Sequence, residues 1–128
     1  MISKTKLKYN LNLFRRYANG AEIGCVLKSN SYGCGTKIIT NFFSSNGIKT
    51  FFVATHEEAK DLASILNRNT RIYVLADYWE PIKSLKKTQI ISVISRYEDL
   101  DKSIKIFKND SGSLASIHLD CGLNRYGM

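Results

Sequence analysis

The fold is set by residues 23–35, which read IGCVLKSNSYGCG: an apolar run, a lysine, and a turn that contains two glycines. The run Ile23–Leu27 is rich in residues that favour a buried β-strand. Directly after the turn, Thr36–Ser45 spaces its apolar residues as one face of a helix, and Gly47 is suited to end that helix. The segment therefore predicts a strand, a turn and a helix in succession.

The same alternation repeats along the chain. Further strands are predicted at Thr50–Ala54, Arg71–Leu75, Ile90–Ile94 and Ser116–Leu119, and further helices at Leu7–Tyr17, His56–Leu66, Pro81–Lys87 and Tyr97–Phe107. Thr55 and Glu58 have the spacing of a capping box, in which each side chain accepts a hydrogen bond from the other residue's backbone. Strands joined by a helix run parallel. We expect an α/β fold with about five parallel strands and four connecting helices, either as an open doubly wound sheet or as part of a barrel.

The length of the chain limits the architecture. It has 128 residues, of which 44% are hydrophobic, enough for one core. A complete (β/α)₈ barrel needs ~250 residues, so a barrel built from this chain is expected to be partial. Residues 1–8 lack the apolar stretch of a secretory signal, and no apolar run approaches the ~20 residues of a membrane-spanning helix. We expect a cytoplasmic protein without a membrane segment.

The chain is basic, with 19 Lys and Arg residues against 11 Asp and Glu and a net charge of +8. This balance permits binding to nucleic acid, but the positive residues are spread along the chain, which favours solvated faces over a polyanion site. The three cysteines, Cys25, Cys34 and Cys121, have neither a paired nor a zinc-like spacing. We expect free thiols and no metal site.

Lys28 has the position of a reactive amine. It follows a predicted buried strand, and parallel α/β folds bind their ligands at the carboxyl ends of strands. Partial burial would favour the neutral, nucleophilic amine over the ammonium. Tyr32, the two glycines and the start of the next helix offer a phenol and N–H groups suited to a phosphate. The alternative interpretation is a strand-end lysine that extends into solvent beside a glycine-rich turn.

The order Lys-x-Asn-x-Tyr-Gly-x-Gly at residues 28–35 resembles the cofactor-binding signature of the alanine racemase family, whose members use pyridoxal 5′-phosphate. Three later segments resemble further family blocks in the same order. Val53–Ala59 is similar to the second strand and its Glu-Ala helix start, Arg71–Leu75 to the third strand, and His118–Met128 to the block Asp-Thr-Gly-Met-x-Arg-x-Gly. The resemblance implies the N-terminal portion of a TIM-type (β/α) barrel.

The resemblance also implies roles for four residues. Lys28 is implied to bind the cofactor and to act as one of two catalytic bases. Tyr32 is implied to hydrogen-bond the cofactor phosphate, and Leu75 to line the pocket of the cofactor ring. Arg125 is implied to lie near the ring oxygen and to bind the substrate carboxylate, for which a planar guanidinium is well suited. The implied substrate is alanine, interconverted between its L and D forms.

Three residues depart from the family pattern. His118 stands where many members have a lysine that positions the arginine, and it is either a hydrogen-bond donor in that role or a strand-end histidine with a structural partner. Cys34 replaces a histidine of the Tyr-Gly-x-Gly turn, and Cys121 replaces the threonine of the C-terminal block. These changes affect the fine geometry of the implied site but leave its cofactor-binding residues in place.

By the same resemblance, residues 1–128 correspond to part of the barrel domain, and the β-rich C-terminal domain is absent. The second base, which that domain supplies to the partner subunit, is absent with it. Because racemisation needs a base on each face of the α-carbon, we expect little turnover by this chain alone. We expect a homodimer or association with a separate C-terminal half. The alternatives are a non-catalytic module that binds pyridoxal phosphate and a basic nucleic-acid-binding domain.

Overall fold

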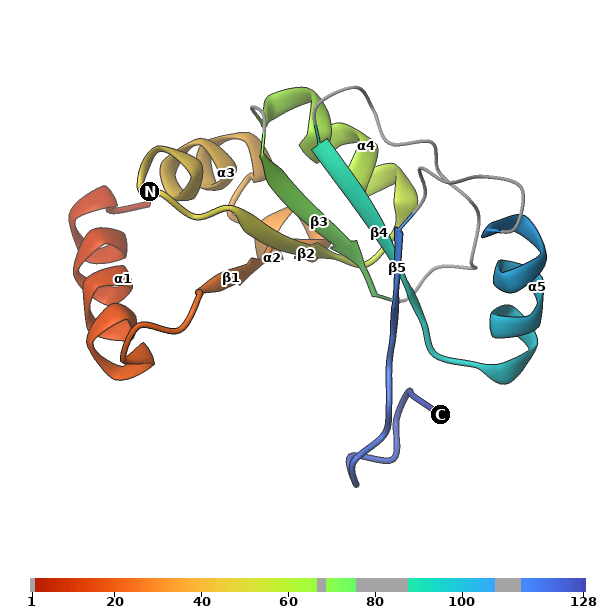
Figure 1. Ribbon diagram of the computed structural model, residues 1–128. Coiled ribbons are helices and arrows are strands. Elements are labelled where there is room, and N and C mark those ends of the chain that lie inside the picture. The colour runs from red at the N-terminus through yellow and green to blue at the C-terminus, as the bar shows by residue number, and fades with distance from the viewer. Residues whose placement is uncertain (1, 67–68, 76–87, 108–113) are drawn as a thin grey trace.

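Among the described residues, the sheet has five parallel strands that follow one another in chain order (Figure 1). The computed structural model describes residues 2–66, 69–75, 88–107 and 114–128. The strands are β1 (Gly24–Val26), β2 (Thr50–Val53), β3 (Thr70–Val74), β4 (Thr88–Ile94) and β5 (Leu114–Ile117), in the sheet order β1-β2-β3-β4-β5. A doubly wound sheet reverses its order at a switch point, whereas a barrel does not. The sequential order therefore decides between the two expected architectures, and the fold is α/β of the TIM-barrel type.

The described helices are α1 (Lys4–Ala18), α2 (Lys28–Tyr32), α3 (Thr36–Ser45), α4 (His56–Ile65) and α5 (Tyr97–Phe107). The predicted bounds of α3 and α5 are confirmed at both ends, α4 ends one residue early, and α1 is longer than predicted. The strand predicted at Ser116–Leu119 begins and ends two residues earlier, as β5. The predicted helix Pro81–Lys87 lies outside the described residues. None of the described helices is both long and apolar enough to cross a lipid bilayer.

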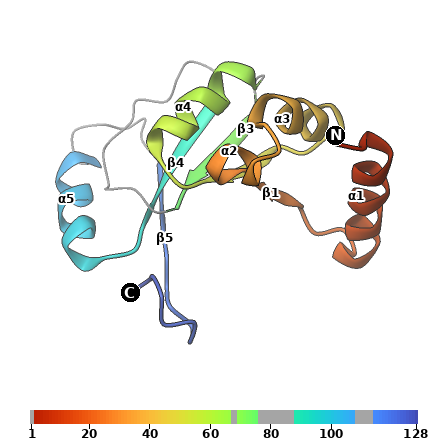
Figure 2. The same cartoon turned by 180° about the vertical axis from the view of Figure 1, so that it is seen from behind.

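The helices α3 and α4 cover one face of the sheet, and both views show them on the same side of β2 and β3 (Figure 1, Figure 2). Side chains alternate between the two faces of a strand, so every second residue of these strands is buried under the helices. The core combines strand and helix residues: Phe51, Val53, Ile72, Val74, Ile90, Ile39, Ala59 and Leu62. This packing fixes the ends of the strands, where the candidate site residues lie.

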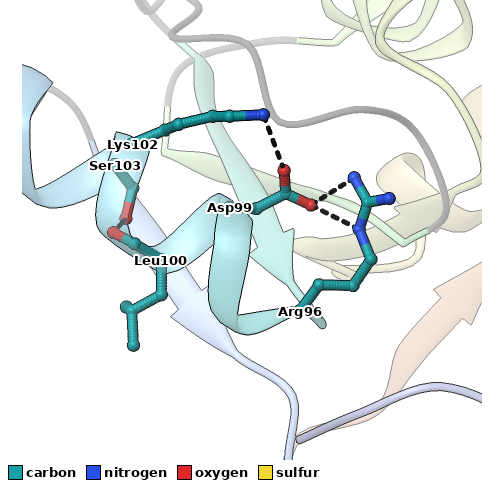
Figure 3. A network of polar contacts seen from close by, with 5 residues as sticks. All are labelled: Arg96, Asp99, Leu100, Lys102 and Ser103. Carbon is teal, nitrogen blue, oxygen red and sulfur yellow. Dashed lines mark hydrogen bonds and ion pairs between the residues drawn. The ribbon is translucent and has the colours of Figure 1, made fainter.

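The strand β4 has buried residues on both faces of the sheet. Ile90, Ile91 and Ile94 are at most 6% exposed, as the near-continuous apolar run of this strand predicts. After the strand, α5 begins with a polar network that Figure 3 shows. Asp99, 7% exposed, accepts a hydrogen bond from Arg96 Nε at 2.6 Å and lies 2.5 Å from Arg96 Nη2. A carboxylate in the first helical turn also faces the positive end of the helix dipole, so this pair fixes the start of α5.

The helix α4 begins with the predicted capping box. The Glu58 N–H donates to Thr55 Oγ1 at 3.2 Å, and the Thr55 N–H donates to Glu58 Oε2 at 3.4 Å. The next residue, His56, is buried, and its Nε2 lies 3.1 Å from the Ser92 hydroxyl of β4. Because the first N–H groups of a helix have no partner within the helix, these contacts define where α4 starts relative to the sheet.

Candidate active site

Lys28 follows β1 and Leu27 at the carboxyl edge of the sheet. The prediction of a buried strand is wrong for β1, whose residues are exposed or half-buried because it lies at the edge of the described sheet. The preceding residue, Leu27, is buried, and its N–H continues the strand pairing by donating to the Phe52 carbonyl at 2.8 Å. Lys28 itself is half-buried, and its Nζ lies 6.0 Å from the centre of the Tyr32 ring. This distance is within the range of a cation–π contact, and Tyr32 is 64% exposed. The structure therefore brings two of the predicted site residues together, an amine and a phenol.

Residues 29–32, which make up all of α2 except Lys28, form a left-handed helical turn. All four are residues other than glycine, and their φ values lie at +53° or +54°. In this region the Cβ atom approaches the following carbonyl, which costs about 1–2 kcal/mol per residue. Inside the turn, the Ser31 N–H donates to the Leu27 carbonyl at 3.0 Å. Strained backbone persists only where the surrounding structure enforces it, and it is concentrated at functional sites. The strained turn therefore supports a functional role for the segment around Lys28.

Asn30, within the same turn, caps the start of α3. Its Oδ1 accepts the Thr36 N–H at 2.8 Å and the Thr36 hydroxyl at 3.2 Å. A helix N-terminus binds an anion through its free N–H groups, and one of these groups in α3, that of Thr36, already has an acceptor. In the expected phosphate cradle the Thr36 N–H is therefore not free, whereas the phenol of Tyr32 is exposed.

Glu58 connects the turn after Lys28 to the end of β2. Its Oε1 accepts the Ser29 N–H at 2.6 Å, and its Oε2 accepts the Ala54 N–H at 2.8 Å. The capping-box spacing predicts only the contact of Glu58 with Thr55. No spacing rule indicates the bond to Ser29, because that residue lies 29 positions away in the sequence.

Leu75 and His118 line a groove of about 380 Å³. The groove also includes Phe52 and Tyr73, neighbours across β2 and β3 whose rings stack with their centres 5.0 Å apart. Phe52 follows the buried Phe51 on β2, and Tyr73 follows the buried Ile72 on β3. Because successive side chains of a strand point to opposite faces, the groove lies on the face of the sheet opposite to α3 and α4. The predicted site residue Leu75 and the strand-end His118 thus share an aromatic surface on the inner side of the barrel-type sheet.

Arg125 lies on an exposed C-terminal loop, which extends away from the sheet (Figure 1). The Asp120 N–H donates to the Met128 carbonyl at 3.0 Å and closes the loop. The Asp120 carboxylate accepts the N–H groups of residues 122–124 at 2.9–3.1 Å. These bonds, with that from Asn124 foremost, hold the pKa of Asp120 below its usual value because they stabilise the charged carboxylate. The loop that carries Arg125 is therefore organised by Asp120, a role that the sequence reasoning missed.

The structure also describes the surroundings of the three residues that depart from the family pattern. The Nδ1 of His118 lies 3.3 Å from the Ser95 hydroxyl, which supports the interpretation of a strand-end histidine with a structural partner. Cys34 and Cys121 are exposed free thiols, as expected. Cys25, on β1, is half-buried, and its burial raises the pKa of this thiol to about 11.

The predicted site residues therefore fall into three places. Lys28 and Tyr32 lie together beyond β1, Leu75 lies in the groove on the inner face, and Arg125 lies on the C-terminal loop. None of Lys28, Tyr32 and Arg125 is among the described residues that line the groove. Fold and site together define a class: α/β proteins of the barrel type with a partly buried lysine at the carboxyl end of the first strand.

Comparison with known proteins places the chain within that class. Residues 2–128 match the family model described as alanine racemase, N-terminal domain. The chain therefore belongs to the alanine racemase N-terminal domain family.

Curated relatives agree with this assignment. The alanine racemase of Borreliella burgdorferi (strain ATCC 35210) is 34% identical over 135 residues, which cover 100% of this chain and 35% of the relative. The alanine racemase of Rickettsia prowazekii is 31% identical over 134 residues, covering 99% of this chain and 32% of the relative. The chain thus spans about a third of the length of these relatives.

Solved structures share the fold. The alanine racemase from Bartonella henselae with covalently bound pyridoxal phosphate has a TM-score of 0.87 at 24% identity, over 98% of this chain and 37% of that one. A histidine racemase from Leuconostoc mesenteroides has a TM-score of 0.77 at 24% identity, over 98% of this chain and 34% of that one. Because proteins named for two different amino acids share this fold, the fold alone does not identify the substrate.

Proposed function

We propose that this chain contributes the lysine of a pyridoxal-phosphate-dependent amino acid racemase site, with alanine as the substrate. The observation that carries the proposal is the place of Lys28, a half-buried residue held between the buried Leu27, which follows β1, and a strained left-handed turn. The curated relatives named alanine racemase support the substrate. The solved relative with covalently bound pyridoxal phosphate supports the cofactor.

The side chains at the site fit pyridoxal 5′-phosphate in their chemistry. Lys28 offers a primary amine that can condense with an aldehyde. Tyr32, whose ring centre lies 6.0 Å from Lys28 Nζ, offers an exposed phenol that can donate to a phosphate oxygen. We propose that Leu75 packs against the cofactor ring and that Arg125 binds the substrate carboxylate. When bound, the cofactor supplies a ring that accepts electron density from the substrate α-carbon.

In this proposal Lys28 moves the α-proton on one face of the substrate. A second base must act on the opposite face, because inversion requires removal from one side and return from the other. Since the chain spans about a third of its relatives, we propose that residues beyond this stretch supply the second base. Residues 1–128 then form part of the barrel domain of the active assembly.

The edges of the described sheet support an assembly larger than the five strands. β1 and β5 lie at its two edges, where unpaired N–H and C=O groups are open to further strands. Their apolar residues are exposed, at 43% for Val26, 45% for Leu114 and 55% for Ile117. We propose that these edges pair with the remaining strands of a closed barrel, supplied either by a longer form of this polypeptide or by a partner chain.

The proposal is tested by locating the lysine that reacts with pyridoxal phosphate. The purified protein is incubated with the cofactor, reduced with borohydride and mapped by mass spectrometry. We expect modification confined to Lys28, loss of that modification in Lys28→Ala, and no change in Lys37→Ala, which removes an exposed lysine of the neighbouring α3. Labelling spread evenly over the surface lysines would show that no cofactor site exists.

A racemisation assay tests the requirement for a second base. We expect the 128-residue chain to label at Lys28 but to interconvert the alanine enantiomers very slowly. Addition of the complementary part of a relative's racemase should raise the rate if the edges of the sheet are docking surfaces. Turnover at ordinary enzymatic rates by the chain alone would refute the need for residues beyond this stretch.

A further inference from the structure

We infer that Glu58 is a positioning residue for Lys28, because it holds the left-handed turn that begins directly after the lysine. This inference rests on the proposed function of Lys28 and goes beyond it, since it concerns how the amine is oriented. Glu58 comes from α4 and reaches across the junction between two strand ends. Its shortest hydrogen bond, at 2.6 Å, goes to the Ser29 N–H and not to its own helix.

The two carboxylate oxygens of Glu58 serve different segments. Oε1 accepts the Ser29 N–H beyond β1, and Oε2 accepts the Ala54 N–H beyond β2 at 2.8 Å and the Thr55 N–H at 3.4 Å. The helix-capping contact is therefore the longest of the three. A capping role alone would require only that contact, so the remaining two bonds have another purpose: they join the carboxyl ends of β1 and β2 at the residue next to Lys28.

The turn needs a contact of this kind from outside. Residues 29–32 all have positive φ, a conformation that residues other than glycine leave when nothing holds them. Ser29 is the first of these residues, and its N–H bonds to Glu58. If that bond is lost, the turn can relax toward negative φ, and the direction of the Lys28 side chain relative to Tyr32 changes with it.

Three variants of the full chain separate positioning from capping. Glu58→Ala removes both acceptor oxygens, and Glu58→Gln keeps one carbonyl oxygen. The matched control Thr55→Ala removes the Thr55 hydroxyl from the capping box but leaves the bond between Glu58 and Ser29. Each variant is labelled with pyridoxal phosphate and borohydride, and with acetic anhydride in the absence of cofactor. The ratio of Lys28 to Lys37 modification and the midpoint of thermal unfolding are measured on the same samples.

We expect Glu58→Ala to lower the Lys28 selectivity for pyridoxal phosphate about tenfold or more, since a hydrogen bond to a charged group typically contributes at least that factor. Glu58→Gln should fall between Glu58→Ala and the wild type. Thr55→Ala should lower the unfolding midpoint without changing the selectivity. If selectivity instead follows the unfolding midpoint through all three variants, or survives in Glu58→Ala, Glu58 does not position Lys28.

The test also distinguishes this inference from the proposed function. If the wild type does not label selectively at Lys28, the cofactor proposal fails, but the acetic anhydride ratio still reports the environment of the amine. Amide hydrogen exchange at Ser29 provides a measurement that needs no cofactor. Exchange at Ser29 that is no faster than in the wild type in Glu58→Ala, or in Glu58→Leu if Glu58→Ala does not fold, would overturn the inference, because both variants lack an acceptor for the Ser29 N–H.

Discussion

The thiol of Cys25 provides a direct test of how β1 is packed. Cys25 lies three residues before Lys28 and packs against the core, and its burial raises the pKa from an ordinary value of 9.0 to about 11. The thiolate is the reactive form of a cysteine. The rise of the pKa from 9.0 to about 11 lowers the fraction of Cys25 present as thiolate at pH 8 about 100-fold. Because a higher pKa also makes the thiolate more nucleophilic, the pKa alone slows the reaction about tenfold. We therefore expect Cys25 to react with a disulfide reagent at least about tenfold more slowly than a thiol with an ordinary pKa.

The same shift makes stability depend on pH. The folded chain holds the Cys25 proton more tightly than the unfolded chain does, so the contribution of this group is complete below pH 9. Between about pH 9 and pH 11 the unfolded chain releases the proton first, and the free energy of unfolding falls as the pH rises. The full pKa difference between the folded and unfolded chain would correspond to about 3 kcal/mol of unfolding free energy. The contribution of Cys25 is smaller than this limit, because solvent reaches the partly buried thiol and screens it.

The assay follows each thiol by mass spectrometry during labelling at pH 8, with the exposed Cys34 and Cys121 as internal controls. Urea unfolding of the wild type and of Cys25→Ala at pH 8 and pH 10.5 isolates the contribution of this thiol, since other groups titrate equally in both proteins. We expect the wild type to lose more stability than Cys25→Ala over this interval. Labelling of Cys25 as fast as the two controls would show that β1 is not packed as the structure has it, and Lys28 would then lack a fixed position.

Three further substitutions test the core, the C-terminal loop and the start of α5. Phe51→Ala removes a side chain that is 0% exposed, and the lost burial and the cavity should cost about 3–5 kcal/mol in urea unfolding; a loss below 1 kcal/mol would contradict the core. Gly127→Ala should speed proteolysis of the loop, because an added Cβ would lie 2.5 Å from the Asp120 nitrogen at a φ of +116°; unchanged cleavage would contradict that geometry. Arg96→Ala should lower stability by about 1–3 kcal/mol, since the 7% exposed Asp99 loses a charged partner, and Glu98→Ala, at an exposed neighbour, should not.

Local patterns in the sequence predict most of the elements of this fold. The bounds of α3 and α5 are confirmed because their apolar residues follow a helical period without interruption. The parallel direction of the strands follows from the connecting helices. The order of the strands does not, because an open sheet and a barrel use the same β-α units and differ only in where each new strand is added. That choice depends on contacts between units, which periodicity does not describe.

The site was predicted to a different degree at each residue. Lys28 and Tyr32 are four residues apart, so a single turn brings them together, and the motif that contains both is enough to indicate their proximity. Arg125 is separated from Lys28 by most of the sheet, and its place depends on a loop that Asp120 organises through backbone N–H groups. Such bonds depend on the conformation of the loop and leave little trace in residue spacing.

Glu58 shows why the turn after Lys28 could not be predicted. The sequence explains this glutamate fully as the second member of a capping box, and the structure confirms that contact. However, a carboxylate has two oxygens and accepts about four hydrogen bonds, so one helix cap leaves most of its capacity free. The Ser29 N–H uses this capacity at 2.6 Å and links the turn to a helix that begins 27 residues later. Residues other than glycine adopt positive φ mainly as single residues, whereas Ser29, Asn30, Ser31 and Tyr32 form a run of four. We therefore infer that a charged acceptor from another element, which holds the first N–H of the run, helps to stabilise it.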